Sequence, residues 1–267
     1  MPALFDSGVN LFSAQFDADR LAVVQRAKAQ GVHRLLLISS DLAETELNQS
    51  YCESQSGLYC TAGVHPHAAA SVCDNWLQHL TQLSQHEHIV AIGECGLDFN
   101  RDFSPRPQQI EVFEQQLVLA KQLKKAVYLH ERDAFDTQLA LLKQHDIQQG
   151  VAHCFTGDVQ QMRAYLDLGL HIGITGWLCD ERRHQPLLDA VQYLPLDRLL
   201  LETDAPYLLP RTLTPKPKNR RNEPMYLPEI VSYIAQVTGH QPEQIQQISW
   251  QNSCRLFNLP QDLSHGD

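Results

Sequence analysis

Residues 108–130, with the sequence QQIEVFEQQLVLAKQLKKAVYLH, contain a helix pattern followed directly by a strand pattern. Apolar side chains recur at three- and four-residue steps from Ile110 to Ala120, which predicts an amphipathic helix over Gln108–Leu123. The run Ala126–His130 is short and mostly apolar, which is typical of a buried strand. A helix followed by a strand is the pattern of a chain in which strands and helices alternate. The number of strand-helix units therefore indicates the fold class.

The same alternation runs through the whole chain. The strand-sized runs lie near Leu4–Val9, Leu35–Ser39, Tyr59–Val64, Ile89–Glu94, Ala126–His130, Gly150–Cys154, His171–Thr175 and Leu199–Thr203. Helical patterns separate them, such as Asp19–Gln30, and two more helices are expected between Leu227 and Leu259, with Pro242 at a helix start. Eight units in 267 residues, without a glycine-rich dinucleotide motif after the first strand, predict one α/β domain over residues 1–267, a (β/α)8 TIM barrel.

Composition excludes several protein classes. The formal net charge of −10 argues against a basic protein that coats DNA, and no apolar run reaches the ~20 residues of a membrane span. The seven cysteines are odd in number and contain no C-x-x-C pair, so we expect reduced thiols. The N-terminus has no targeting pattern, and we expect a cytoplasmic protein without membrane partners and, by default, a monomer.

Polar side chains gather at the ends of the predicted strands. They are Asp6 and Asn10, His65 and His67, Glu94 and Asp98, His130 and Arg132, His153, and Glu202 and Asp204. In a barrel these strand ends meet at one face, where imidazoles and carboxylates together form a divalent-metal site.

Each histidine alone has a simpler interpretation. His130 or His153 by itself would more often be a hydrogen-bonded core residue, but Glu94 and Asp204 at equivalent strand ends favour the metal site. The pair in His86-Glu87-His88 precedes a strand, so it is expected at the opposite end of the barrel and outside the site.

Several short stretches resemble a known family. Val64-His65-Pro66-His67, Ile92-Gly93-Glu94-Cys95-Gly96-Leu97-Asp98, His153-Cys154-Phe155-Thr156-Gly157, Gly173-Ile174-Thr175-Gly176 and Glu202-Thr203-Asp204-Ala205-Pro206-Tyr207 resemble, in order, signature stretches of the TatD metal-dependent hydrolases. Further stretches, including Asp6–Leu11, Cys179–Arg183 and Arg220–Pro224, are similar to those of the TatD subgroup itself. The resemblance runs nearly from end to end.

The resemblance implies an amidohydrolase-like barrel that removes nucleotides from the 3′ ends of single-stranded DNA and RNA, with a part in DNA repair. It implies that Glu94, His130 and His153 are metal ligands. Asp204 is then a further ligand or the group that orients and deprotonates the attacking water. The strand-end analysis selects the same four residues.

One position departs from the family pattern. Most relatives have a His-x-His pair at the end of the first strand, where this chain has Gly8 and Asn10. Because glycine offers no ligand and an amide oxygen is a weaker donor than imidazole, we expect one firm metal and a second that depends on substrate phosphate. The family implies Mg²⁺; Mn²⁺ is the expected substitute, and the two imidazoles make Zn²⁺ a further candidate.

Other residues near the strand ends have two open interpretations each. His65 and His67 either donate protons to the phosphate or leaving group, or only shape a turn. Arg132 either clamps phosphate or forms an ion pair with Asp133 or Glu131. Glu202 either orients another ligand or binds the conditional metal.

Substrate contacts are expected from aromatic and basic side chains. Phe99, Tyr207 and Trp177 follow predicted strands and are candidates for stacking on bases. Five cations lie in an acid-free stretch over residues 209–222 that should stand near the metal and attract phosphate: Arg211, Lys216, Lys218, Arg220 and Arg221.

Two other functions fit the same barrel. A metal-bound water also serves an amidohydrolase or deacylase that acts on a small amide or aminoacyl ester. A non-catalytic barrel that binds nucleic acid or a protein partner is the other alternative, and the presence of Asp204 with both ligand histidines argues against it.

Overall fold

The computed structural model describes residues 3–262, and it places eight parallel strands in one sheet in sequence order. The strands are β1 (Leu4–Val9), β2 (Val32–Leu37), β3 (Leu58–Ala62), β4 (Ile89–Asp98), β5 (Ala126–Arg132), β6 (Gly150–Ala152), β7 (His171–Ile174) and β8 (Leu199–Leu201). Hydrogen bonds from Asn10 N to Ala205 O (2.8 Å) and from Asp204 N to Gly8 O (2.9 Å) join the first strand to the segment after the last. The predicted (β/α)8 barrel is therefore confirmed.

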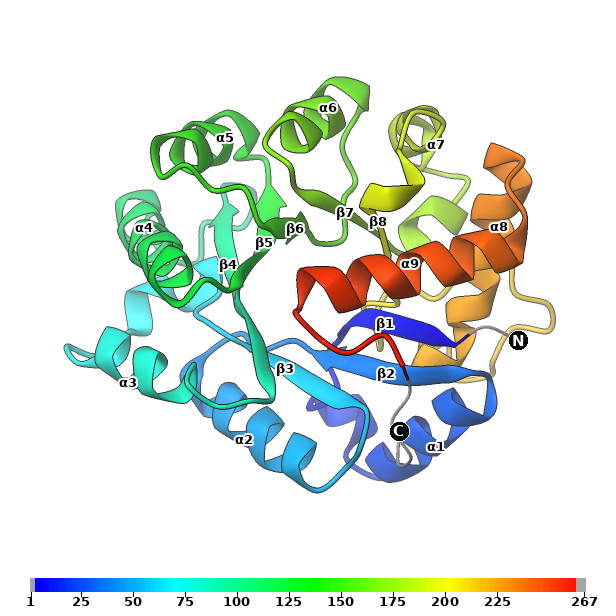
Figure 1. Cartoon of the computed structure of the whole chain (residues 1–267), viewed down its shortest axis with the longest axis horizontal. Helices are drawn as coiled ribbons and strands as arrows, with labels where there is room; N and C mark the ends of the chain where they lie inside the picture. Colours follow the sequence, from blue (N-terminus) through cyan, green and yellow to red (C-terminus); the bar gives the residue numbers. More distant parts are fainter. Residues whose placement is uncertain (1–2, 263–267) are drawn as a thin grey trace.

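Helices surround the sheet, as Figure 1 shows. They are α1 (Arg20–Ala29), α2 (Leu42–Glu53), α3 (Trp76–Leu83), α4 (Arg106–Leu123), α5 (Phe135–Gln144), α6 (Val159–Asp167), α7 (Gln185–Val191), α8 (Leu227–Thr238) and α9 (Pro242–Leu256), with short 3-10 turns at Ala14–Phe16, Pro66–Ser71, Gly176–Cys179, Leu196–Arg198 and Pro224–Tyr226. Both predicted C-terminal helices are present, and Pro242 begins the second. Among residues 3–262, no helix combines the length and apolar character that a bilayer span requires.

Two apolar regions hold the barrel together. The larger lies between strands and outer helices, and the smaller fills the barrel interior. Side chains alternate between them along a strand: Leu35 and Leu37 join the outer region, whereas Leu36 and Ile38 join the inner one. Trp250, Cys254 and Phe257, from α9 and the residue after it, join the inner region. Helix α9, which lies across one end of the barrel in Figure 1, therefore closes the interior at that end.

Strand β4 differs from the expectation that it ends at Glu94. It continues to Asp98 and pairs with β5 as far as Arg132, with a register shift between Ile92 and Cys95. Gly96 permits this close pairing, since its φ is +142° and a Cβ there would lie 1.9 Å from the carbonyl oxygen of His130. Glu94 consequently lies inside the strand at the register shift, where a bulge can redirect a side chain.

Candidate metal centre

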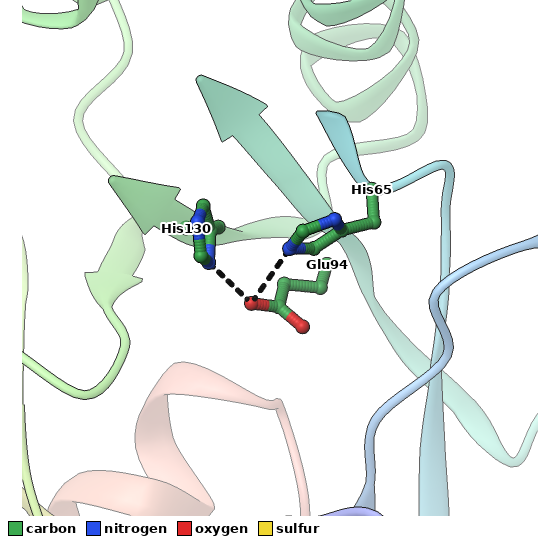
Figure 2. Close-up of side chains that lie close together, drawn as sticks. All are labelled: His65, Glu94 and His130. Atoms are coloured by element: carbon green, nitrogen blue, oxygen red, sulfur yellow. Dashed lines mark hydrogen bonds and ion pairs between the residues drawn. The ribbon is translucent and has the colours of Figure 1, made fainter. Parts of the chain in front are cut away.

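Three side chains from neighbouring parts of the barrel meet at its C-terminal end. Glu94 comes from β4, His130 from β5 and His65 from the segment after β3, and both imidazoles point at one carboxylate oxygen in Figure 2. His130 Nδ1 lies 2.9 Å from Glu94 Oε1, and His65 Nε2 lies 3.7 Å from the same oxygen. One ligand atom from each residue lies within 4.8 Å of the others, a spacing that a metal ion can bridge.

The tautomer of His65 makes this ring a hydrogen-bond donor. Its Nδ1 accepts a hydrogen bond from the backbone N–H of His67 at 3.1 Å. Burial lowers the pKa of His65 to about 3, so the ring is neutral and carries its proton on Nε2. The donor atom of His65 therefore faces Glu94 and the space around it.

Asp98 connects two histidines at the true end of β4. Its Oδ2 lies 2.7 Å from His67 Nε2 and 3.3 Å from His130 Nε2, and its side chain is almost fully buried. Burial raises the pKa of this carboxyl, but hydrogen bonds from its neighbours, His130 first, hold it well below its usual range. Asp98 therefore stays ionised and fixes both rings. His67 faces Asp98, not Glu94.

A second group of contacts orients His153. Its Nδ1 lies 2.8 Å from Glu202 Oε2 and 2.7 Å from the Tyr128 hydroxyl, which leaves Nε2 directed toward Asp204 Oδ1 at 3.7 Å. Glu202 is fully buried and contacts His153 at Nδ1, the ring nitrogen that faces away from Asp204. This arrangement is typical of a metal-binding histidine, in which the ring nitrogen that faces away from the metal donates to a carboxylate and the other ring nitrogen stays free to bind the metal.

Asp204 lies between His153 and the first strand. Asn10 Nδ2 donates to Asp204 Oδ1 at 2.8 Å, so the amide orients this carboxylate through its nitrogen. Burial raises the pKa of Asp204 to about 6, against the opposing effect of His153. A carboxylate with this pKa can accept a proton from water near neutral pH.

The glycine of the first strand has a structural explanation. A Cβ at Gly8 would lie 2.3 Å from the Tyr128 hydroxyl and 3.4 Å from His153 Cε1. Tyr128 therefore occupies the space that a side chain at position 8 would need, and its hydroxyl lies 2.9 Å from the carbonyl oxygen of Ser7.

The carboxylates attract positive charge to this end of the barrel. Burial lowers the pKa of His130, but hydrogen bonds to Asp98 and Glu94 outweigh it and raise the pKa to about 9. Burial likewise opposes the charge of Glu202 at His153, whose pKa rises to about 10. Divalent ions bind to neutral imidazole, so metal binding here must compete with protons.

The remaining predicted site residues are distributed as follows. Arg132 is exposed and makes no ion pair within the described residues 3–262, so the suggested pairs with Asp133 and Glu131 are absent there. Phe99 is half-buried, and the guanidinium of Arg106 lies 4.5 Å from its ring centre, which argues against its stacking role. Tyr207 is 52% exposed and is available to substrate.

Trp177 and the basic loop are partly engaged within the protein. Arg183 covers the Trp177 ring at 3.6 Å. Arg211 pairs with Glu181, and Arg221 pairs with Asp19 at 2.8 Å. The other loop cations are exposed and have no ion pair in the described part of the chain: Lys216, Lys218 and Arg220.

Some contacts were missed in the sequence. Tyr128 shares a strand face with His130, two residues further along, and period-two alternation could have placed its hydroxyl beneath the metal ligands. The bridging role of Asp98 had no sequence signal beyond its place near a strand end. His86 pairs with Glu53 and precedes β4, at the opposite end of the barrel as expected. All seven cysteines are free thiols.

Fold and site together define a metal-dependent hydrolase of the TIM-barrel class. The sequence profile of the family described as TatD related DNase matches residues 5–258, and the chain belongs to this family. It is 48% identical over 259 residues to the 3′-5′ ssDNA/RNA exonuclease TatD of Rahnella sp. (strain Y9602), covering 96% of this chain and 98% of that protein.

Two further relatives agree. The protein of the same description from Klebsiella pneumoniae (strain 342) is 48% identical over 258 residues, covering 96% of this chain and 98% of that protein. The crystal structure of the TatD homologue YJJV from Escherichia coli superposes with a TM-score of 0.88 at 30% identity, covering 96% of this chain and 98% of that chain.

Proposed function

We propose that this protein is a divalent-metal-dependent 3′-5′ exonuclease that hydrolyses phosphodiester bonds of single-stranded DNA and RNA. The observation that carries the proposal is the meeting of His65, Glu94 and His130 at the C-terminal end of the barrel, where His153 and Asp204 also face each other. The relatives described as 3′-5′ ssDNA/RNA exonucleases supply the substrate class.

Glu94, His130 and His153 would hold the metal, with Asp204 beside them. Hydrogen bonds to both histidines support this assignment of the ligands, because Glu202 orients His153 and Asp98 orients His130. A bound divalent ion supplies a Lewis acid that offsets phosphate charge and acidifies water. We propose Mg²⁺, with Mn²⁺ or Zn²⁺ as substitutes, and a second ion only when substrate phosphate completes its ligands, because Gly8 contributes none.

Asp204 orients the attacking water and takes its proton. Asn10 fixes one carboxylate oxygen, and the pKa of about 6 allows proton uptake near neutral pH. Attack on phosphorus breaks its bond to the 3′ oxygen of the preceding nucleotide, and this oxygen needs a proton as it leaves.

The neutral His65 is placed to donate a hydrogen bond from Nε2 to a phosphate oxygen. His67, held by Asp98 and more exposed, is the candidate that would protonate the leaving oxygen. Of the two interpretations that the sequence leaves open for these histidines, we therefore propose the catalytic one.

The test uses 5′-labelled single-stranded DNA and RNA with Mg²⁺, with and without EDTA. The wild-type chain should produce a stepwise ladder, whereas EDTA, Glu94→Ala and Asp204→Asn should each reduce the rate by about 10³-fold or more. Glu87→Ala is the matched control, because Glu87 is exposed and precedes β4 at the opposite end of the barrel. Its rate should equal that of wild type.

Equal cleavage by all variants would contradict the proposal and indicate a contaminating nuclease. Absence of cleavage with Mg²⁺, Mn²⁺ and Zn²⁺ would favour the amidohydrolase or deacylase alternative. A role in DNA repair, the monomeric state and a cytoplasmic location stay predictions.

A further inference from the structure

An exposed phenylalanine lies beside the proposed catalytic centre. The Phe103 side chain is 63% exposed, the largest exposure among the large apolar residues of the described chain. Its ring centre lies 4.7 Å from that of His67 in an edge-to-face contact, and the His67 ring lies 4.3 Å from that of His65. The His67 ring therefore lies between Phe103 and His65, which belongs to the group of residues around Glu94.

The backbone on both sides of Phe103 is fixed. The buried Ser104 hydroxyl donates to His67 O and accepts from Ala70 N, both at 2.9 Å. Before Phe103, Asp98 Oδ1 accepts from the backbone N–H of Arg101 at 2.8 Å. The exposed ring therefore sits on a rigid loop, which is the arrangement that a preorganised binding surface needs.

A cation accompanies the ring. The Arg101 guanidinium lies 5.9 Å from the Phe103 ring centre and makes no ion pair within residues 3–262. The nearby Arg106 differs, because it is neutralised by Asp102 at 2.8 Å. The loop thus offers an open aromatic surface and one uncompensated positive charge, next to a proposed proton donor.

We propose that Phe103 and Arg101 form a subsite for one unpaired nucleobase near the 3′ end, with the base stacked on Phe103 and Arg101 beside the adjoining phosphate. Every base has a flat apolar surface, so stacking tolerates any sequence but requires a base that is not paired. The subsite rests on the proposed exonuclease function, and it gives that function a physical basis for selecting single strands.

The test compares Phe103→Ala with Phe103→Trp and with a matched control, Tyr193→Ala. Tyr193 is 61% exposed but lies between α7 and β8, at the opposite end of the barrel. Substrates are single-stranded DNA oligonucleotides, either intact or with one abasic nucleotide at the first, second or third position from the 3′ end.

Phe103→Ala should raise KM for intact DNA about 5- to 100-fold, the loss expected for one stacked base, with kcat changed less than twofold. Wild type should lose a similar factor at one abasic position, and Phe103→Ala should lose nothing further there. Phe103→Trp should keep the wild-type KM, and so should Tyr193→Ala.

A second readout is independent of cleavage. In the Asp204→Asn background, a 2-aminopurine at the sensitive position should lose fluorescence on binding, and Phe103→Ala should abolish this loss. Equal abasic penalties in wild type and Phe103→Ala, or unchanged quenching, would overturn the subsite while leaving the exonuclease intact. Absence of cleavage by wild type would instead overturn the proposed function, and quenching would still decide the subsite.

Discussion

The two ends of the barrel interior differ in the chemistry of the side chains that fill them. At the N-terminal end the interior is mostly apolar around the buried side chain of Arg34, and Phe5 packs against Trp250 and Phe257 with ring centres 6.0–6.2 Å apart. At the C-terminal end the side chains are carboxylates and imidazoles, among them Glu94 and His130. One end is sealed by α9, and the other presents its polar groups for ligands.

The difference shows how stability and chemistry are separated along one set of strands. Strand β5 illustrates it, since Ala126 and Tyr128 belong to the apolar interior and His130 to the metal centre. Burial of carboxylates is costly, and a well-packed apolar end can offset that cost. Tyr128 lies at the boundary, with its ring in the apolar cluster and its hydroxyl against His153.

The largest effect is expected at the sealed end. Phe5→Ala should lower the free energy of unfolding by about 3–5 kcal/mol, because Phe5 is fully buried among aromatic rings. Urea denaturation measures this change, and Phe5→Leu, which leaves a smaller cavity, should cost less than Phe5→Ala. Activity per folded molecule should stay within twofold of wild type. A tenfold fall in that activity would show that the two ends are coupled.

At the boundary, Tyr128→Phe should reduce metal affinity or activity about 10- to 100-fold, because His153 and Glu202 lose their shared partner. Metal titration and single-turnover kinetics measure the effect. Tyr165→Phe is the matched control, since Tyr165 is equally buried but lies on α6. A Tyr128→Phe protein with wild-type metal affinity and rate would contradict the assigned role.

A smaller effect concerns His171, at the start of β7. Burial, together with Arg198 and Arg255, lowers its pKa to about 4 from an unfolded value near 6.5. Between pH 6.5 and pH 4 the unfolded chain therefore binds more protons than the folded chain. The contribution of His171 to the free energy of unfolding is complete above pH 6.5 and is lost as the pH falls toward 4. At pH 5 the loss is about 2 kcal/mol.

His171→Asn should remove this part of the pH dependence, as measured by urea denaturation at pH 5 and pH 7. The exposed His240 provides the control, and His240→Asn should keep the wild-type dependence. If His171→Asn and wild type lose equal stability between pH 7 and pH 5, the assignment to His171 is wrong.

The sequence predicted the features that follow from periodicity. The eight strands, the two final helices and the strand-end positions of His130, His153 and Asp204 all result from alternating apolar and polar patterns. A register shift has no such pattern, because it depends on how two distant strands pair. The extension of β4 beyond Glu94 to Asp98 therefore appeared only in the structure.

Side-chain contacts were the other feature that could not be predicted from the sequence. Phe99 and Phe103 are both aromatic residues of one loop, yet Arg106 covers the first and leaves the second exposed. Arg221 was expected to attract phosphate, and instead it is engaged by Asp19, some 200 residues earlier in the chain. The first contact depends on the path of a loop and the second on packing between distant segments, and local sequence patterns encode neither.

The most direct test of the central claim is to locate a bound ion. A crystal soaked in Mn²⁺ should give one strong anomalous peak at bonding distance from Glu94, His130 and His153, and Glu94→Ala should abolish it. A peak away from the C-terminal end of the barrel, or none at saturating Mn²⁺, would contradict the assignment of the open barrel end as the metal centre, and a peak on His65, Glu94 and His130 would contradict the role of His153 as a ligand.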